Sequence, residues 1–337
     1  MKWLEKTWAE LTASEMFALF RLRSEVFVVE QDCVYLDMDD KDAQSIHLGA
    51  LDLNVPAGAA ARAVVRLVPP GISYSEPSIG RVAISLQDRG TGLGQELMER
   101  SLRACQRIWP EMPIRISAQV YLLRFYESFG FISEGDPYEE DGLPHIQMYK
   151  PAVGWGSLRQ QLEKSTETFT KRLVDLPDHA LNGSTDSWGG YQVLQHLIWS
   201  EQNTLAYLAK KGQANPSDLP RADGETDERG WKLSKALMSD RKWKDPTGDR
   251  LTPSSDGFKE RNEMEALLKS WAAEREMQWQ SLSAIFENQL WWKVEVFNHP
   301  IAGRLTLLDA LDFLSKHIDH HVHQLTRIQN ALNSRGL

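Results

Sequence analysis

The sequence contains little cysteine, fewer basic than acidic residues, and no long apolar run. Its two cysteines, Cys33 and Cys105, cannot build a disulfide framework in a chain of 337 residues and suit a reducing compartment. Asp and Glu number 47 against 38 Lys and Arg, and the net charge of −9 disfavours nucleic-acid and anionic-membrane partners. No segment approaches membrane-spanning length, and Met1–Leu11, which contains Glu5 and Glu10, lacks the apolar core of a signal peptide. We therefore expect a cytoplasmic protein that binds neither nucleic acid nor a membrane.

Length and composition indicate a globular protein with two domains. Hydrophobic residues make up 42% of the chain and charged residues 25%, which is enough apolar material for sizeable cores. Pro151, Gly154 and Gly156 interrupt the pattern, and no strand pattern dominates beyond them. We place the two domains at residues 1–150 and 151–337.

The first domain is organised around Gly80–Gly94, GRVAISLQDRGTGLG. Residues 80–85 are rich in β-branched side chains and predict a strand, while Gly92 and Gly94 open an amphipathic helix. Glycines at a helix start let backbone N–H groups approach an anion closely, and the helix dipole adds positive character there. The stretch therefore predicts a phosphate-binding loop. It has neither the spacing of a dinucleotide fingerprint nor the Gly-Lys-Ser/Thr of a P-loop.

Two motifs in this domain resemble those of the GNAT acyltransferases. Arg89–Gly94, RGTGLG, is similar to the Q/R-x-x-G-x-G/A loop that binds the pyrophosphate of coenzyme A, and Arg124–Phe131 is similar to the family's F-Y-x-x-x-G-F motif. The runs 20–31, 37–42 and 138–145 resemble the ElaA branch of the superfamily. The resemblance covers roughly the whole first domain. It implies an α/β fold with a mixed central sheet and splayed central strands.

The same resemblance implies acetyl-CoA as the cosubstrate. The strand 80–85 would splay from the strand 114–118, so that backbone groups of Val82 and Ile84 bind the pantetheine arm. The loop N–H groups would bind the pyrophosphate, and Arg89 would either add positive charge or remain solvated. The coenzyme-binding residues expected on this basis are Val82, Ala83, Ile84, Arg89, Gly90, Thr91, Gly92, Leu93, Gly94, Gln119 and Phe125.

Acyl transfer requires a neutral amine, a donor near the thioester carbonyl and an acid for the leaving thiolate. Tyr126 matches the family position that commonly protonates the sulfur, although it could instead be a core aromatic residue. Glu30 matches a position at the acceptor site and is the expected base, with His47 and His145 as alternatives that structural roles would also explain. The acidic run nearby either attracts a cationic acceptor or is solvated, and we expect Asp40 and Asp42 to be solvated. The acceptor would be a small-molecule or peptide amine.

The second domain predicts four long amphipathic helices, and therefore a bundle. A Thr306-x-x-Asp309 start signal precedes the last one. A connection at 212–258, rich in Pro, Gly and Asp, separates the second helix from the third and contains Trp231 and Trp243. The four predicted helices are 157–175, 191–210, 262–288 and 306–332.

Four of the nine histidines lie between residues 317 and 323. Residues at i and i+4 share a face of a helix and can bind one metal ion. On a helical wheel, His321 lies within the buried stripe and His317 on its edge, while His320 lies further off and His323 points away. His196 on the second helix could supply a third ligand. The stripe is defined by Leu307, Leu314, Leu325 and Ile328.

This arrangement resembles the DinB-like, or YfiT-like, metal-binding bundles. Their pattern is one histidine on the second helix and H-x-x-x-H-x-x-Q on the last, which Gln324 completes, and Phe297–Gly303 resembles their lead-in to the last helix. The resemblance covers roughly residues 152–335 and implies zinc or nickel on three histidines, with a fourth position open for water. The alternative is a histidine-rich helix without metal.

The sequence thus predicts an acetyl-CoA-dependent N-acyltransferase fused to a metal-binding four-helix bundle. One alternative makes the bundle the main catalyst, a metal-dependent small-thiol S-transferase or a hydrolase, with the first domain as a coenzyme A sensor. Another makes the bundle a non-enzymatic binding module. The oligomeric state stays open, a homodimer included.

Overall fold

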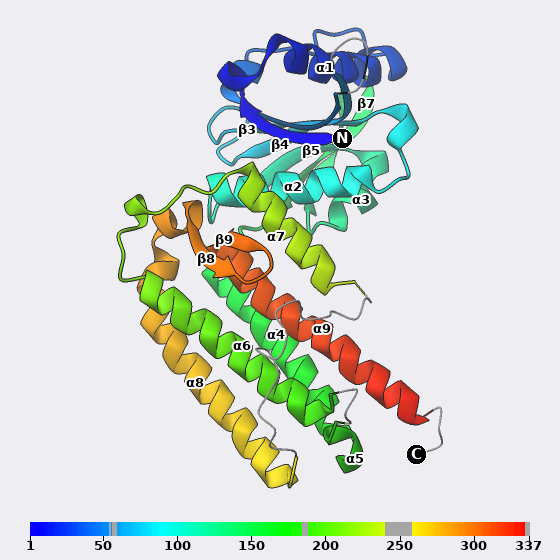
Figure 1. The fold of residues 1–337 in the computed structure, drawn as a ribbon. Helices are drawn as coiled ribbons and strands as arrows, with labels where there is room; N and C mark the ends of the chain where they lie inside the picture. The colour runs from blue at the N-terminus through cyan, green and yellow to red at the C-terminus, as the bar shows by residue number, and fades with distance from the viewer. Residues whose placement is uncertain (54, 56–58, 184–187, 240–257, 334–337) are drawn as a thin grey trace. The chain divides into compact units, whose positions relative to one another are not determined.

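The computed structural model describes residues 1–53, 55, 59–183, 188–239 and 258–333 (Figure 1). The chain divides into two compact units, Met1–Gly154 and Trp155–Leu337. In the described part of the chain, no helix combines the length and the apolar character that crossing a membrane requires.

The N-terminal unit is built on a sheet of seven strands. They are β1 (Lys2–Thr7), β2 (Ile46–Asp52), β3 (Ala60–Val68), β4 (Ser78–Ile84), β5 (Ile114–Gln119), β6 (Ile132–Glu140) and β7 (Leu143–Lys150). Their order across the sheet is β1-β2-β3-β4-β5-β7-β6. All neighbours pair antiparallel except β4 and β5, which are parallel, so the sheet is mixed.

Helices cover both faces of this sheet (Figure 1). They are α1 (Ala13–Arg23), α2 (Leu93–Ile108) and α3 (Leu123–Glu127). On the α1 face, Leu19 packs in one core cluster with Val64 of β3. On the α2 face, Leu97 and Met98 are fully buried in a second, larger cluster. The burial of apolar side chains on both faces stabilises the sheet and fixes the start of α2 beside β4.

The helical stretch from Ala13 to Glu30 has two parts. It is α-helical up to Arg23, and Ser24–Glu30 continues with a wider, π-helical winding. This second part contains three valines, and β-branched residues favour the α-helix only weakly. The wider turn ends at Glu30, one of the predicted site residues. It therefore sets the direction from which that carboxylate approaches the rest of the unit.

The C-terminal unit is a bundle of long helices with a small hairpin (Figure 1). The elements are α4 (Trp155–Val174), α5 (Asp178–Leu181), α6 (Gly190–Lys211), α7 (Gly224–Leu237), α8 (Arg261–Glu287), β8 (Glu295–His299), β9 (Gly303–Thr306) and α9 (Leu307–Asn333). The four long helices α4, α6, α8 and α9 pack on one another, which confirms the predicted α/β unit followed by a helical bundle. The start signal of α9 is also confirmed: Thr306 Oγ1 donates to Asp309 Oδ2 at 2.7 Å, and Asp309 N–H donates to Thr306 Oγ1 at 3.1 Å.

A long helix and a hairpin of this unit lie in segments where the sequence predicted neither. The helix α7 falls within the connection 212–258, and the hairpin β8–β9 precedes α9. The helix packs closely on α9, because a Cβ at Gly230 would lie only 2.0 Å from Asp309 Oδ1. Only a glycine permits this approach. Trp243, which belongs to the same connection, lies outside the described residues.

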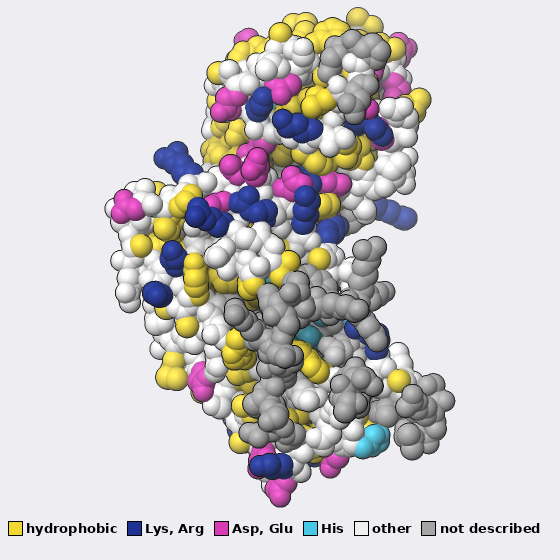
Figure 2. Space-filling view, in the orientation of Figure 1, with side chains coloured by type: hydrophobic (Ala, Val, Ile, Leu, Met, Phe, Trp, Pro, Cys, Tyr) yellow, Lys and Arg dark blue, Asp and Glu magenta, His cyan; other side chains and the backbone are white. Residues whose placement is uncertain are grey.

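Charged side chains of both signs are interspersed on the face of each unit drawn in Figure 2. One ion pair lies inside the bundle: Arg275 of α8 donates from Nε to Glu201 Oε1 at 2.5 Å and from Nη2 to Glu201 Oε2 at 2.6 Å. Both side chains are buried, and a buried pair with this bidentate geometry holds its two helices in one register. The pair therefore fixes α6, which carries His196, against α8.

Candidate functional sites

The parallel strands β4 and β5 form a fork. They pair at Ser78 and Arg115, and no further pair follows in these two fully described strands. The other edge of β4 pairs with β3 through an irregular register beside Arg81, whose φ is +54°. Such an irregularity bends a strand and increases its twist. The bend turns the second half of β4 away from β5.

The strand-edge groups inside the fork belong to Val82 and Ile84. Ser85 N–H donates to the carbonyl of Arg62 in β3 at 2.9 Å. Backbone groups alternate sides along a strand, so those at positions 82 and 84 face the fork. Ala83 lies between them, is buried and pairs with β3. The fork thus presents the edge groups that an extended ligand would use.

A glycine loop joins β4 to α2. Gly90 has a φ of +75° and Gly92 a φ of +92°, a left-handed conformation that glycine adopts without strain. Gly92 is the N-cap residue of α2, so the N–H groups of Leu93 and Gly94 belong to the first turn, which has no acceptor within the helix. The Leu93 side chain is buried in the core and anchors the loop. The start of α2 therefore presents N–H groups from a fixed backbone.

Asp88 holds this loop in place. Its carboxylate is paired with Arg62 and accepts from Ser85, and the Arg62 guanidinium lowers the pKa of Asp88. Its carbonyl accepts the Thr91 hydroxyl at 2.6 Å, and the Thr91 N–H lies 3.4 Å from the same carbonyl. The Thr91 amide is therefore engaged within the loop, whereas the amides of the first turn of α2 have no intrahelical acceptor.

Several predicted coenzyme residues meet where the fork reaches α2. A Cβ built on Gly94 would lie 3.6 Å from Ile84 Cγ1 and 3.9 Å from Phe125 Cζ. Gln119, at the end of β5, donates from Nε2 to Gln31 Oε1 at 3.2 Å. Segments far apart in the sequence thus converge on one region of this unit.

Tyr126 lies on α3 and is buried among core residues. It is 7% exposed, and its ring makes edge contacts with Phe125 and Phe131. Burial raises the pKa of its phenol, so that the hydroxyl stays protonated. Among the residues that the structure describes, none is hydrogen-bonded to this hydroxyl. The geometry supplies a neutral acid group close to the Phe125–Gly94 contact.

Glu30 and Arg89, both predicted site residues, bind each other. Arg89 Nη1 and Nη2 donate to Glu30 Oε1 and Oε2, each at 2.7 Å. Hydrogen bonding from the Arg89 guanidinium lowers the pKa of Glu30. A carboxylate held in this way is a poor proton acceptor, which weakens the interpretation of Glu30 as a base.

The acidic run 37–42 is neither an open attractant nor fully solvated. Asp42 is 2% exposed, and it accepts from Arg23 Nη1 at 2.6 Å and from Arg66 Nη1 at 3.0 Å. Burial alone would raise the pKa of Asp42, but the two guanidinium groups lower it. The expectation of a solvated Asp42 is wrong, because its arginine partners come from α1 and β3, which adjacent sequence does not reveal.

The two histidines considered as bases in this unit serve structural contacts. His47 is fully buried, its Nε2 lies 2.9 Å from the Asp42 carbonyl, and burial lowers its pKa. His145 contacts the Leu143 carbonyl through Nδ1 at 2.9 Å, beside the β6–β7 turn. His47 lies on β2, which does not border the fork, whereas His145 pairs with Gln119 at the end of β5 and its ring lies 6.4 Å from that of Tyr138.

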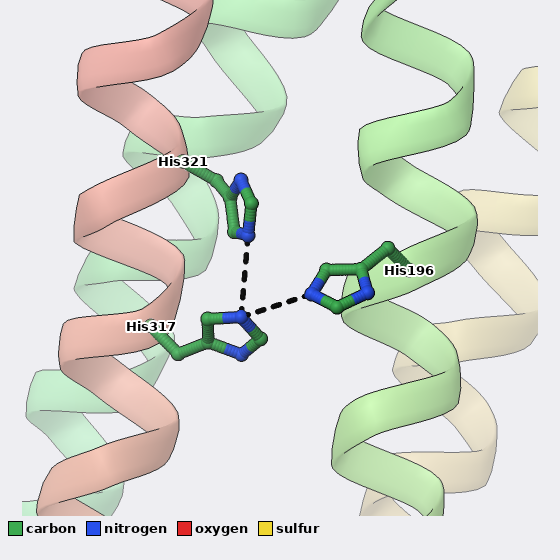
Figure 3. Close-up of side chains that lie close together, drawn as sticks. All are labelled: His196, His317 and His321. Atoms are coloured by element: carbon green, nitrogen blue, oxygen red, sulfur yellow. Dashed lines mark hydrogen bonds between the residues drawn. The ribbon is translucent and has the colours of Figure 1, made fainter. Parts of the chain in front are cut away.

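The three histidines singled out in the second half converge in the bundle (Figure 3). His196 projects from α6, and His317 and His321 project from α9. His317 Nε2 lies 3.0 Å from His196 Nε2 and 3.2 Å from His321 Nε2, and one ligand atom from each ring lies within 4.8 Å of the others. His323, on the same helix, is exposed.

This cluster fits a divalent transition metal. Burial lowers the pKa of both His317 and His321 well below its ordinary value, with the neighbouring imidazoles adding to the shift, so the rings are neutral and can ligate. Tetrahedral zinc at about 2.0–2.1 Å from each nitrogen needs nitrogens about 3.3 Å apart, close to the 3.0 and 3.2 Å that separate His317 Nε2 from the other two imidazole nitrogens. Gln324 Oε1 lies 2.8 Å from His321 Nδ1 and accepts a hydrogen bond from Nδ1–H, which leaves Nε2 free for a metal.

Aromatic rings enclose the cluster. Phe313 stacks on His317 with ring centroids 5.1 Å apart, and the Trp188 ring lies 5.0 Å from that of His196. His299, on the hairpin, makes an edge contact with Phe313 at 4.8 Å. Rings packed in this way fix the imidazole orientations and limit access of water.

Known proteins are similar to each half of the chain. Residues 29–151 match the acetyltransferase (GNAT) domain family. Protein ElaA of Escherichia coli is 38% identical over 156 residues, which cover 45% of this chain and 98% of ElaA. The chain belongs to the ElaA family. A UPF0039 protein of Synechocystis sp. is 39% identical to it over 148 residues, covering 44% of this chain and 94% of that protein.

Solved structures and a second family complete the comparison. An acyl-CoA N-acyltransferase from Pseudomonas aeruginosa is 40% identical, with 44% of this chain and 98% of that one covered and a TM-score of 0.41. Residues 161–325 match the DinB superfamily. Both resemblances drawn from the sequence are therefore confirmed, the ElaA-type half and the DinB-like half.

The ElaA-type half contains polar residues that the sequence did not single out. Arg81 donates from Nε to Asp37 Oδ1 at 2.7 Å, and its guanidinium lies over the Tyr35 ring at 5.5 Å. No sequence pattern predicts the left-handed backbone conformation of Arg81. In the DinB-like half, His320 was placed off the buried stripe but is 8% exposed, because its Nδ1 meets the Leu237 carbonyl of α7 at 2.8 Å. The Asp223–Thr226 start signal could have predicted α7, the helix whose end buries His320.

Proposed function

We propose that the protein is an acetyl-CoA-dependent N-acyltransferase and that its DinB-like half binds one divalent metal ion. The observation that carries the first part is the fork between β4 and β5, which leads directly to the glycine loop at the start of α2. Its edge groups suit the amides of a pantetheine arm, and the first-turn N–H groups of Leu93 and Gly94 suit a pyrophosphate. Membership in the ElaA family supports the assignment.

The chemistry proposed at the fork is acyl transfer to an amine. The neutral amine nitrogen bonds to the carbonyl carbon of the thioester, and the carbon–sulfur bond breaks. The Tyr126 hydroxyl gives its proton to the leaving sulfur, and the proton that the amine loses passes through water and restores the phenol. Burial keeps this phenol protonated until the thiolate forms. Glu30 has a different role in this scheme, which is to hold Arg89 beside the loop.

Two measurements on the purified full chain test the first part. Calorimetric titration with acetyl-CoA should give a one-to-one complex, and a thiol-release assay with primary amines should give turnover that depends on the amine. Absence of acetyl-CoA binding by the folded protein would contradict the proposal. Binding without turnover of any amine would favour a coenzyme A sensor instead.

The second part rests on the convergence of three imidazoles. His196, His317 and His321 would hold the metal and leave a further coordination position open, and Gln324 would orient His321. A bound zinc or nickel ion would supply Lewis acidity and lower the pKa of a bound water or thiol. Metal-dependent small-thiol S-transferase or hydrolase activity is the second candidate function, favoured by the aromatic enclosure around His317. Elemental analysis of the protein after dialysis tests the metal itself, as set out in the Discussion.

A further inference from the structure

A hydrogen-bond network spans the neighbouring strands β5, β7 and β6, outside the groups assigned so far. Ser117 Oγ donates to Glu140 Oε2 at 2.7 Å and lies 2.5 Å from the Tyr138 hydroxyl. Tyr138 also points to Glu140 Oε2 at 3.3 Å, and Gln147 Nε2 donates to the Tyr138 oxygen at 2.6 Å. Neutral donors therefore hold the Glu140 carboxylate in one position.

This network stands at the fork between β4 and β5. The parallel pair sets Ser78 opposite Arg115, so two residues further on Ser117 is level with Gly80, next to the irregular turn of β4. The burial pattern of β5 puts Ser117 on the face opposite the α2 core, together with Gln119. A group bound at Glu140 would thus lie near the end of the fork where the two strands meet.

Arginines bind several carboxylates near the fork, whereas Glu140 has no cationic partner among the described residues. The carboxylate–arginine pairs are Glu30–Arg89, Asp37–Arg23, Asp37–Arg81, Glu76–Arg115 and Glu134–Arg115. The charge of Glu140 is oriented by hydroxyl groups but not neutralised, so it is available to an incoming cation.

The same pairs decide which amines suit the site. Arg81 and Arg115 are the arginines whose strands border the fork, and each is already paired with a carboxylate. An acceptor with a carboxylate beside its amino group would find no unpaired arginine in β4 or β5, and it would be repelled by Glu140. An amine without that carboxylate carries only the charge that Glu140 attracts.

We propose that Glu140, held by Ser117 and Tyr138, binds the ammonium group of the acyl acceptor, and that this acceptor is a primary alkylamine without a neighbouring carboxylate. The proposal rests on the acyltransferase function proposed above. Glu140 concentrates the cation at the fork, and the ammonium gives its proton to water before the neutral nitrogen attacks the thioester. The Glu140 carboxylate is an acceptor-binding group, which predicts an effect on KM for the amine.

The test uses the full chain, acetyl-CoA and two matched amines. Pentylamine and norleucine differ only by the carboxylate beside the amino group. We expect turnover of pentylamine with a kcat/KM at least about tenfold above that of norleucine. Glu140→Gln should raise KM for pentylamine about tenfold or more, since the negative charge that strengthens the bond to the ammonium group is lost, while acetyl-CoA affinity stays within about twofold.

Glu139→Gln is the matched control, because its side chain points to the other face of β6. Equal effects of Glu139→Gln and Glu140→Gln, or equal use of both amines, would overturn the proposal. If the wild type binds acetyl-CoA but acetylates neither amine, the acceptor class is wrong while coenzyme binding stands. If the folded wild type does not bind acetyl-CoA, the acyltransferase function itself falls, and the calorimetric titration separates the two failures.

Discussion

Arg89 and Glu30 form a bidentate ion pair, with both guanidinium nitrogens 2.7 Å from the two carboxylate oxygens. The pair joins the end of the π-helical turn to the glycine loop. The sequence predicted different roles for these segments, a general base in the first and pyrophosphate binding in the second. Both side chains are partly exposed, so the pair contributes little to stability. Its consequence is functional, because it withdraws Glu30 from proton transfer and holds the charge of Arg89 beside the loop.

We therefore expect Glu30→Gln to lower kcat by less than about tenfold, whereas loss of a true general base costs about 10²–10⁴-fold. The substitution frees the Arg89 guanidinium, so acetyl-CoA should bind more tightly, and the gain should fade as salt is raised. Glu25→Gln, which breaks the exposed Arg21–Glu25 pair, is the control and should change neither quantity. A loss of kcat above a hundredfold with acetyl-CoA binding intact would make Glu30 the base after all.

The glycine loop predicts a sharp effect of charge at the start of α2. Gly92→Glu should abolish acetyl-CoA binding, because it puts a carboxylate where the helix start presents N–H groups to the pyrophosphate. The φ of +92° makes any side chain strained there, so Gly92→Ala serves as the control for strain alone. Calorimetry should find weakened binding for the alanine variant and none for the glutamate variant. Wild-type affinity in a folded Gly92→Glu protein would remove the coenzyme assignment.

The buried phenol predicts a change in turnover without a change in binding. Tyr126→Phe should lower kcat by about tenfold to a thousandfold and leave the affinity for acetyl-CoA within about twofold. The fold should persist, since the ring packing is kept and no described residue depends on the hydroxyl for a hydrogen bond. Tyr121→Phe, at a tyrosine that is 73% exposed on the adjoining turn, is the matched control. Full turnover by Tyr126→Phe would assign the acid elsewhere.

His299 predicts a loss of stability in mild acid. Burial lowers its pKa to about 4 from an ordinary 6.5, and its Nδ1 accepts the N–H groups of Ile301 and Ala302 at 3.2 and 3.1 Å. Below pH 6.5 the unfolded chain takes up a proton that the folded chain refuses. The contribution of neutral His299 to the free energy of unfolding is therefore fully present above pH 6.5. It declines as the pH falls toward 4, by roughly 3 kcal/mol in total.

Urea unfolding followed by tryptophan fluorescence measures this decline, since all but Trp3, Trp8 and Trp109 of the 12 tryptophans lie in the DinB-like half. We expect His299→Asn, which keeps an oxygen acceptor, to reduce the shift of the midpoint between pH 7.5 and 5. The exposed His323→Asn should leave the shift as in the wild type. Equal shifts in wild type and His299→Asn would refute the assignment.

Local signals made much of this fold predictable. The glycine loop, the Thr306–Asp309 start of α9 and the histidine pair at i and i+4 each depend on residues within a few positions of one another. The third histidine, His196, could be predicted because helical periodicity indicates which face of α6 is buried. The positions of residues with a local or periodic sequence signal could therefore be predicted without knowledge of any tertiary contact.

Contacts between distant segments were not predictable in the same way. The Arg23–Asp42 and Arg89–Glu30 pairs join residues 19 and 59 positions apart, and nothing in either segment specifies the partner. The helix α7 escaped prediction because it lies in a segment rich in Gly, Pro and Asp, although Asp223 accepts from Thr226 N–H at 3.0 Å in an ordinary start signal. Missing α7 meant missing the burial of His320 beneath it.

The measurement that tests the metal centre most directly is elemental analysis of four single variants beside the wild type at neutral pH. We predict about one zinc or nickel ion per wild-type chain, a strong loss in His196→Ala, His317→Ala and His321→Ala, and a wild-type content in His323→Ala, whose side chain is exposed on the same helix. Circular dichroism should show that all four variants remain folded. A wild type without metal, or a His323→Ala variant that loses metal as readily as His321→Ala, would contradict the three-histidine site.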